Sequence, residues 1–157
     1  RDDSPQYQLQ ADQNDGRACW NAARVGASKA LSQWLATNQT GTTSAHSLIM
    51  GDLNAYRMED PVRALEQAGW HYLHDEQNPG FSYAFRGRSG SLDHALASPE
   101  LAAYLSTLEH WSINADEPVL LDYSSRYKSA EAQQRLYGAT PYRSSDHDPV
   151  IVTFRFQ

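Results

Sequence analysis

Three short polar segments of this 157-residue chain hold the residue types that could carry out chemistry. They lie at residues 51–56 (GDLNAY), 91–97 (SLDHALA) and 145–150 (SDHDPV). In the last segment an acidic residue stands beside a histidine, which places a metal-binding oxygen next to a group that exchanges protons near neutral pH. One such pair arises easily by chance, so the interpretation depends on all three segments.

The segment at residues 51–56 follows a short apolar run at residues 46–50, which is predicted to be a buried strand. Gly51 allows a tight turn, and Asp52 and Asn54 point the same way if the backbone is extended. A carboxylate beside an amide can handle a proton and donate hydrogen bonds to a phosphoryl oxygen. The alternative, slightly favoured for this segment alone, is a local Asx turn.

Residues 91–97 are predicted to form a strand in which Asp93 shares a face with small alanine side chains. A carboxylate in that setting needs a partner, and an imidazole N–H would satisfy it. We therefore predict that Asp93 orients His147 as a carboxylate orients a catalytic histidine. An exposed edge-strand carboxylate is the alternative, and His94 could face either the site or the core.

The elements that would position these segments follow from apolar periodicity and turn signals. Helices are predicted after Asn21 as N-cap, over residues 60–68 with Val62 and Leu65 facing inward, and at residues 99–105 and 130–137. The first of these helices has a predicted inward stripe of Ala23, Ala27, Ala30, Leu31, Trp34 and Leu35. Strands are predicted at residues 81–86 and 91–97, joined by a hairpin turn at 87–90, and at residues 107–113 and 150–156.

Composition limits the classes of function. The formal net charge of −6 argues against a broad basic surface that holds nucleic acid, although bound divalent cations can supply positive charge locally. No apolar run in the sequence is long enough to span a membrane, and no membrane partner is expected. Cys19 is the only cysteine, and we expect either a reduced buried thiol or one half of a disulfide whose partner lies upstream.

Together and in this order, the Gly-Asp-Leu-Asn, Leu-Asp-His and Ser-Asp-His segments resemble the C-terminal motifs of the endonuclease/exonuclease/phosphatase superfamily. Residues 19–21, 114–118 and 142–150 also look like the secreted bacterial nucleases of that superfamily. The resemblance implies an α/β fold that is part of a two-sheet, deoxyribonuclease-like sandwich. This chain would supply one mostly antiparallel or mixed sheet with helices on its outer face.

The resemblance also implies roles for individual residues. His147 would contact the scissile phosphate with Asp93 orienting it, and Asn54 would hold a phosphoryl oxygen. Asp146 and Asp52 would bind a divalent cation, with Mg²⁺ expected first and Ca²⁺ or Mn²⁺ as alternatives. Asp52 would also position or deprotonate the attacking water; whether Asp52 or His147 is the base stays open. Three arginines that flank the motif strands, Arg86, Arg88 and Arg143, are candidates to bind substrate phosphates, with ordinary solvated arginines as the alternative.

No residue before Asp52 matches the upstream metal-binding glutamate of the superfamily, so residues 1–157 are interpreted as the C-terminal portion of one catalytic domain. The N-terminal half of that domain is then an expected partner. Without it, one sheet face would be uncovered, and the side chains expected on that face are Phe81, Tyr83, Phe85, Val150, Val152 and Phe154.

The expected function is metal-dependent hydrolysis of phosphodiester bonds in DNA by a secreted or periplasmic bacterial nuclease. Alternatives are a sphingomyelinase-like or other small-molecule phosphoesterase, and a non-catalytic fragment or binding module.

Overall fold

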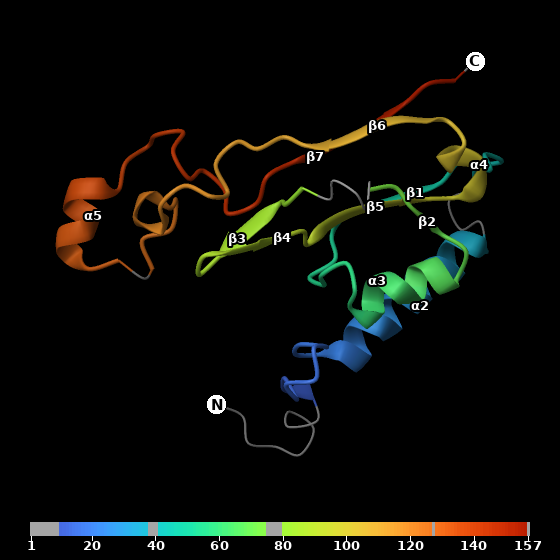
Figure 1. Ribbon diagram of the computed structural model, residues 1–157, viewed down its shortest axis with the longest axis horizontal. Helices are drawn as coiled ribbons and strands as arrows, with labels where there is room; N and C mark the ends of the chain where they lie inside the picture. Colours follow the sequence, from blue (N-terminus) through green and yellow to red (C-terminus); the bar gives the residue numbers. More distant parts are fainter. Residues whose placement is uncertain (1–9, 38–40, 75–79, 127, 157) are drawn as a thin grey trace.

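The structure is a computed structural model that describes residues 10–37, 41–74, 80–126 and 128–156 (Figure 1). Its helices are α2 (Asn21–Ala36), α3 (Asp60–Gln67), α4 (Pro99–Ala102), the 3-10 turn η1 (Val119–Leu121) and α5 (Ala130–Leu136). Its strands are β1 (Leu48–Asp52), β2 (His71–Tyr72), β3 (Tyr83–Phe85), β4 (Arg88–Gly90), β5 (Asp93–Ala97), β6 (Leu105–His110) and β7 (Val150–Phe154). None of the described helices is long and apolar enough to cross a membrane.

The described strands form three antiparallel sheets in the orders β1-β5-β2, β3-β4 and β6-β7. The predicted α/β class is confirmed, while the single predicted sheet is divided into these three sheets. The register of β1 and β5 places Asp52 opposite Asp93 at the end of the ladder. An isolated bridge between Tyr83 and His147 ties the β3-β4 hairpin to the loop before β7. All three polar segments therefore meet at one end of the strands.

The two faces of β5 contact different layers, because successive strand side chains point to opposite sides. On one face Leu96 packs with Ile49 and Leu65 against α2 and α3. On the other face Ala95 and Ala97 pack with apolar side chains from α4, β6 and β7. Figure 1 shows the resulting arrangement, with the two long helices below the central strands and β6-β7 above them. The predicted division of β5 into these two faces is confirmed.

Helix α2 presents a different face from the predicted one. Leu31 and Trp34 are 36% and 48% exposed, and the alanines of the predicted stripe are exposed as well, while the buried residue of the helix is Ser28. Arg24 points inward to an ion pair with Glu59 at 2.7 Å. Leu35 is the stripe residue that packs against the core cluster of Ile49, Leu65 and Leu96. The three alanines of the stripe offer little apolar area, so the Arg24–Glu59 ion pair and the packing on α3 set the rest of the helix rotation. Asn21 is the first helical residue, and the N-cap is Trp20.

The predicted hairpin turn at residues 87–90 is also wrong. Arg86 and Gly87 form the turn, with φ values of 52° and 76°, and the register pairs Phe85 with Arg88. Two consecutive positive φ values are what a two-residue hairpin of the favoured twist requires. The partner of β3 is consequently β4, and β5 pairs instead with β1 and β2.

The other predicted elements lie close to their predicted positions. Helix α3 begins with Pro61 in its first turn, and its predicted inward residues Val62 and Leu65 are fully buried. Strand β1 extends through Gly51 to Asp52 rather than stopping before the glycine. Of the sheet face predicted to lack a cover, Phe85 is 53% exposed, whereas Val152 and Phe154 pack against the core cluster on β5. Cys19 is exposed, not buried.

Candidate active site

The centre of the site is a hydrogen bond between the imidazole of His147 and the carboxylate of Asp93. His147 Nδ1 lies 2.7 Å from Asp93 Oδ2, and the two side chains are 26% and 18% exposed. An ionised carboxylate only accepts, so Nδ1–H donates and Nε2 is left as the second ring nitrogen. The predicted pairing, between residues 54 positions apart in the chain, is confirmed. A histidine held in this way can accept or return a proton on its Nε2 side.

Asp52 and Asn54 lie beside this pair, because β1 runs antiparallel to β5 with Asp52 opposite Asp93. Asp52 Oδ1 accepts the backbone N–H of Asn54 at 2.7 Å, which is the Asx turn, and Asn54 has φ 47°. The Asn54 amide nitrogen also lies 3.3 Å from Asp52 Oδ2. The alternative of an Asx turn is therefore confirmed, and the turn also brings the amide next to the carboxylate. Both side chains are exposed and accessible to a substrate.

A half-buried arginine and a fully buried histidine hold the loop that carries Asn54. Arg24 Nη1 donates to the Asn54 carbonyl at 2.7 Å from α2, and His94 contacts the Ala55 carbonyl through Nε2 at 2.7 Å from β5. His94 is fully buried, and its Nδ1 lies 3.0 Å from the Tyr72 hydroxyl. Burial lowers the pKa of His94, so the imidazole stays neutral and donates from Nε2. His94 thus faces the core and supports the site from behind.

Tyr83 lies beside His147 in the site, whereas the sequence predicted it only as part of an uncovered sheet face. Its ring centroid lies 4.8 Å from that of His147. Burial, followed by the negative charges of Asp146 and then other neighbours including Asp52, raises its pKa. The phenol is therefore a hydrogen-bond donor at neutral pH. Period-two alternation in residues 81–86 was the only sequence signal for its position, and it did not point toward His147.

The predicted metal ligands fit a divalent cation in type but not in number. Among the residues that the structure describes, no group of three or more His, Cys, Asp or Glu side chains could hold a metal ion. Asp52 is exposed and Asp146 half-buried, and both act electrostatically on Tyr83. Carboxylate oxygens suit Mg²⁺, Ca²⁺ or Mn²⁺, which take six or more ligands. A complete coordination sphere would therefore need oxygens from water, substrate or residues outside the described set.

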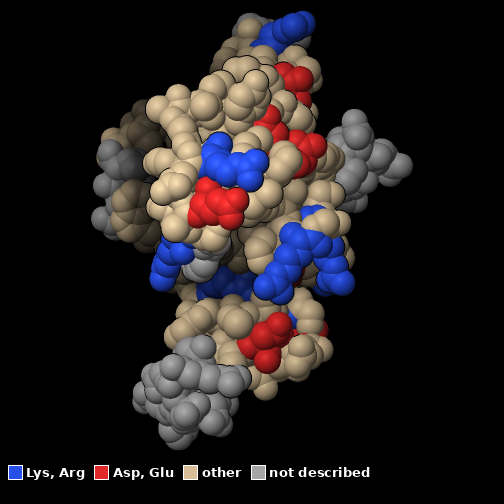
Figure 2. All heavy atoms as spheres, turned by 90° about the vertical axis from the view of Figure 1, so that its left-hand side faces the viewer, with Lys and Arg blue, Asp and Glu red and all other residues tan. Residues whose placement is uncertain are grey.

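The predicted phosphate-binding arginines have different surroundings. Arg143 is 3% exposed, and its guanidinium donates to the carbonyls of Ala115 and Glu117, so it braces the long connection before His147 instead of facing a substrate. Arg88 is exposed on β4, and the Arg86 guanidinium lies 5.1 Å from the ring centroid of Phe85. Figure 2 looks onto this end of the molecule, where Lys and Arg side chains border a hollow. A pocket of about 480 Å³ beside the β3-β4 hairpin is lined by Arg86, Arg88 and Arg143, and also by the acidic Asp116 and Glu117.

Asp148 has a structural role although it follows the Ser-Asp-His motif directly. It is 1% exposed, and its Oδ1 accepts the backbone N–H groups of Ile113, Asn114 and Ala115, each at 3.0 Å. Three such bonds fix the loop that carries His147 to the segment after β6.

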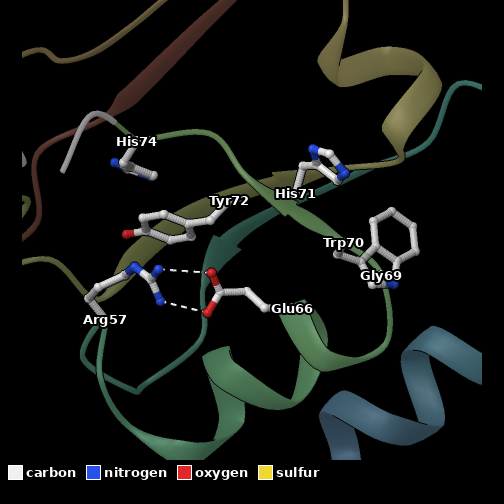
Figure 3. Close-up of a pocket in the computed structure, with 7 residues that line it drawn as sticks. All are labelled: Arg57, Glu66, Gly69, Trp70, His71, Tyr72 and His74. Atoms are coloured by element: carbon white, nitrogen blue, oxygen red, sulfur yellow. Dashed lines mark hydrogen bonds and ion pairs between the residues drawn. The ribbon is translucent and has the colours of Figure 1, made fainter.

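A separate pocket of about 420 Å³ lies between α3 and β2 (Figure 3). Arg57 and Glu66 face each other there in a two-point ion pair of 2.7 and 2.8 Å. His74 and Tyr72 stack above that pair, with ring centroids 4.9 Å apart. The charges of this pocket neutralise each other, and none of the predicted catalytic residues lines it.

The family model described as the Endonuclease/Exonuclease/phosphatase family matches residues 10–147, which include all three polar segments up to His147. No curated protein matches the sequence.

Proposed function

Because the chain belongs to the endonuclease/exonuclease/phosphatase family, whose members hydrolyse phosphate esters, we propose that it contributes the active site of a metal-dependent nuclease that cleaves DNA. The observation that supports this most directly is the 2.7 Å contact between Asp93 and His147, with Asp52 and Asn54 at the end of the same ladder. We further propose that the protein acts outside the cytoplasm, as a secreted or periplasmic enzyme.

In the proposed reaction, a water oxygen bonds to phosphorus while the bond between phosphorus and the leaving oxygen breaks. The water proton passes to Asp52 or to His147 Nε2, and the leaving oxygen takes up a proton from solvent. The Asn54 amide donates to a non-bridging phosphoryl oxygen, where negative charge grows in the transition state. Asp93 keeps the imidazole in one tautomer and orientation throughout. A divalent cation held by Asp146 and Asp52 would neutralise charge on the phosphate when bound.

The proposed preference for a polyanionic substrate depends on Arg88 and Arg86, since Arg143 is occupied internally. Two arginines at the tip of one hairpin suit contacts to phosphates that flank the scissile one, which position a nucleic acid without reading its sequence. Because the formal charge is −6, such contacts would be local, and in this proposal a bound cation supplies further positive charge.

The test is metal-dependent hydrolysis by the intact protein, with supercoiled plasmid DNA, single-stranded DNA, RNA and sphingomyelin as substrates. His147→Ala should lower turnover of DNA by about 10²–10⁴-fold, the range for a lost acid–base group. The matched control is His71→Ala, because His71 is an exposed histidine on β2 outside the site. Turnover of the His147 variant within a few-fold of the unmodified enzyme would remove that residue from the reaction. Cleavage of sphingomyelin but not nucleic acid would replace the proposed substrate class.

A further inference from the structure

Ser82 is a fully buried hydroxyl residue just before β3, and it contacts the carboxylate that holds His147. Its Oγ donates to Asp93 Oδ2 at 2.6 Å, and this is the same oxygen that accepts from His147 Nδ1. Two donors therefore converge on one carboxylate oxygen from different elements. A carboxylate held by a single donor can rotate about its last bond, whereas two donors that approach from different directions limit that rotation.

The direction of the Ser82 hydrogen bond follows from its other neighbours. Ser82 Oγ lies 3.3 Å from the backbone nitrogen of Leu92 and 3.2 Å from that of Asp93, and both of these groups can only donate. The nearby Ser91 hydroxyl donates to the main-chain oxygen of Asp93 at 2.7 Å. With two donors directed at its oxygen, the single hydroxyl proton of Ser82 points to the carboxylate.

The backbone of Ser82 also joins the two segments that carry the pair. Its carbonyl accepts the N–H of Asp148 at 2.7 Å, and its N–H donates to Gly90 at 3.2 Å. The next residue, Tyr83, forms the bridge to His147. Ser82 thus forms hydrogen bonds to the loop that carries His147, to strand β4 and to the start of β5.

We propose that Ser82 is a positioning residue for the Asp93–His147 pair: its hydroxyl fixes the Asp93 carboxylate so that His147 presents Nε2 in one orientation. As far as catalysis is concerned, this inference rests on the proposed phosphodiester hydrolysis. Ser82 does not touch the substrate in this proposal, and it acts only through Asp93.

The first test is the kinetics of Ser82→Ala in the intact protein, with bis(p-nitrophenyl) phosphate and Mg²⁺ as the probe. We expect kcat to fall by about 10–100-fold, as when a group that orients a ligand or base is removed. KM should change by less than about twofold, because the hydroxyl makes no contact with substrate. The matched control is Ser91→Ala, which removes a hydroxyl that lies 3.4 Å from Ser82 Oγ and 3.1 Å from His110 Nε2 but contacts Asp93 only at its main-chain oxygen; its kcat should stay within about threefold.

The second test separates an effect through Asp93 from general loosening. In an Asp93→Ala background, adding Ser82→Ala should lower kcat by less than about twofold, because the carboxylate that Ser82 holds is already absent. Equal fold-losses in the two backgrounds would overturn the proposal.

The third test needs no activity, so it distinguishes failure of this inference from failure of the proposed function. In protein with ¹⁵N-labelled histidine, the Nδ1–H proton of His147 should give a downfield signal that Ser82→Ala abolishes or shifts and Ser91→Ala leaves in place. Should Ser82→Ala not fold, Ser82→Cys, with a weaker donor of similar shape, must show the same change. An unaltered signal in a folded Ser82 variant would refute the positioning role.

Discussion

Acidification is expected to destabilise this protein, and His74 is expected to account for a large part of the loss. His74 is 6% exposed, its Nε2 accepts the backbone N–H of Ala95 at 3.1 Å, and its ring stacks on Tyr72. Burial first, then the neighbouring His110, His94 and Arg57, lowers its pKa from 6.5 to about 3. The folded protein therefore holds this imidazole neutral over most of the accessible pH range.

The sign and size of the effect follow from linkage. A histidine whose pKa is lower in the folded state contributes its full stability above pH 6.5, and that contribution is lost as the pH falls toward 3, because only the unfolded chain takes up the proton. At about pH 5, which is about 1.5 units below the unfolded pKa, protonation of this histidine stabilises the unfolded state by about 2 kcal/mol. The total over the whole range is about 5 kcal/mol. The pKa values of His94 and His110 are lowered as well, which adds in the same direction.

The assay is urea unfolding at about pH 7.5 and about pH 5, for the unmodified protein and for His74→Gln. Glutamine can still accept the Ala95 N–H but does not titrate. The unmodified protein should lose about 2 kcal/mol more than His74→Gln between the two pH values, because all other titrating groups are shared. His71 is an exposed histidine on the neighbouring strand β2, so His71→Gln should lose as much unfolding free energy between the two pH values as the unmodified protein. Equal losses for the unmodified protein and His74→Gln would refute the buried neutral imidazole.

Three further predictions concern the core, the cation and the extent of the domain. Leu96→Ala should lower the free energy of unfolding by about 2–5 kcal/mol in urea unfolding, because Leu96 is fully buried, whereas Leu120→Ala at 58% exposure should stay within about 0.5 kcal/mol. Removing divalent cations with a chelator should abolish cleavage of plasmid DNA, and added Mg²⁺ should restore it; undiminished cleavage in excess chelator would contradict the proposed metal dependence. The 157-residue chain alone should cleave plasmid DNA far more slowly than a protein that also carries the expected N-terminal half, since no group of three or more metal-binding side chains gathers among the described residues; equal rates would show that the missing-half interpretation is mistaken.

Much of the candidate site could be predicted because its chemistry is local in sequence. Asp52 and Asn54 are separated by one residue, and the Asx turn that they form is specified by their own side chains. Alternation in residues 91–97 correctly placed Asp93 on the face of Ala95 and Ala97. In α3, Pro61 in the first turn and the spacing of the apolar side chains predicted both the helix and its buried side. These features need no information from distant parts of the chain.

Features that depend on distant contacts could not be predicted in the same way. Whether His94 faced the site or the core was decided by Tyr72 and the Ala55 carbonyl, which are 22 and 39 positions away. Arg143 is a residue type that often binds phosphate, yet its guanidinium is buried and donates hydrogen bonds to two backbone carbonyls. The rotation of α2 was likewise decided by Glu59, which pairs with Arg24 across 35 positions.

The sequence by itself determined which residue types are available and how each short segment turns, because propensity and side-chain alternation act over a few residues. Only the tertiary structure decided which of those residues meet: Asp93 with His147 and with Ser82, and Tyr83 beside them. The physical reason is that a buried carboxylate or guanidinium takes whichever partner the packed fold brings within about 3 Å, and strand pairing over long separations sets that choice.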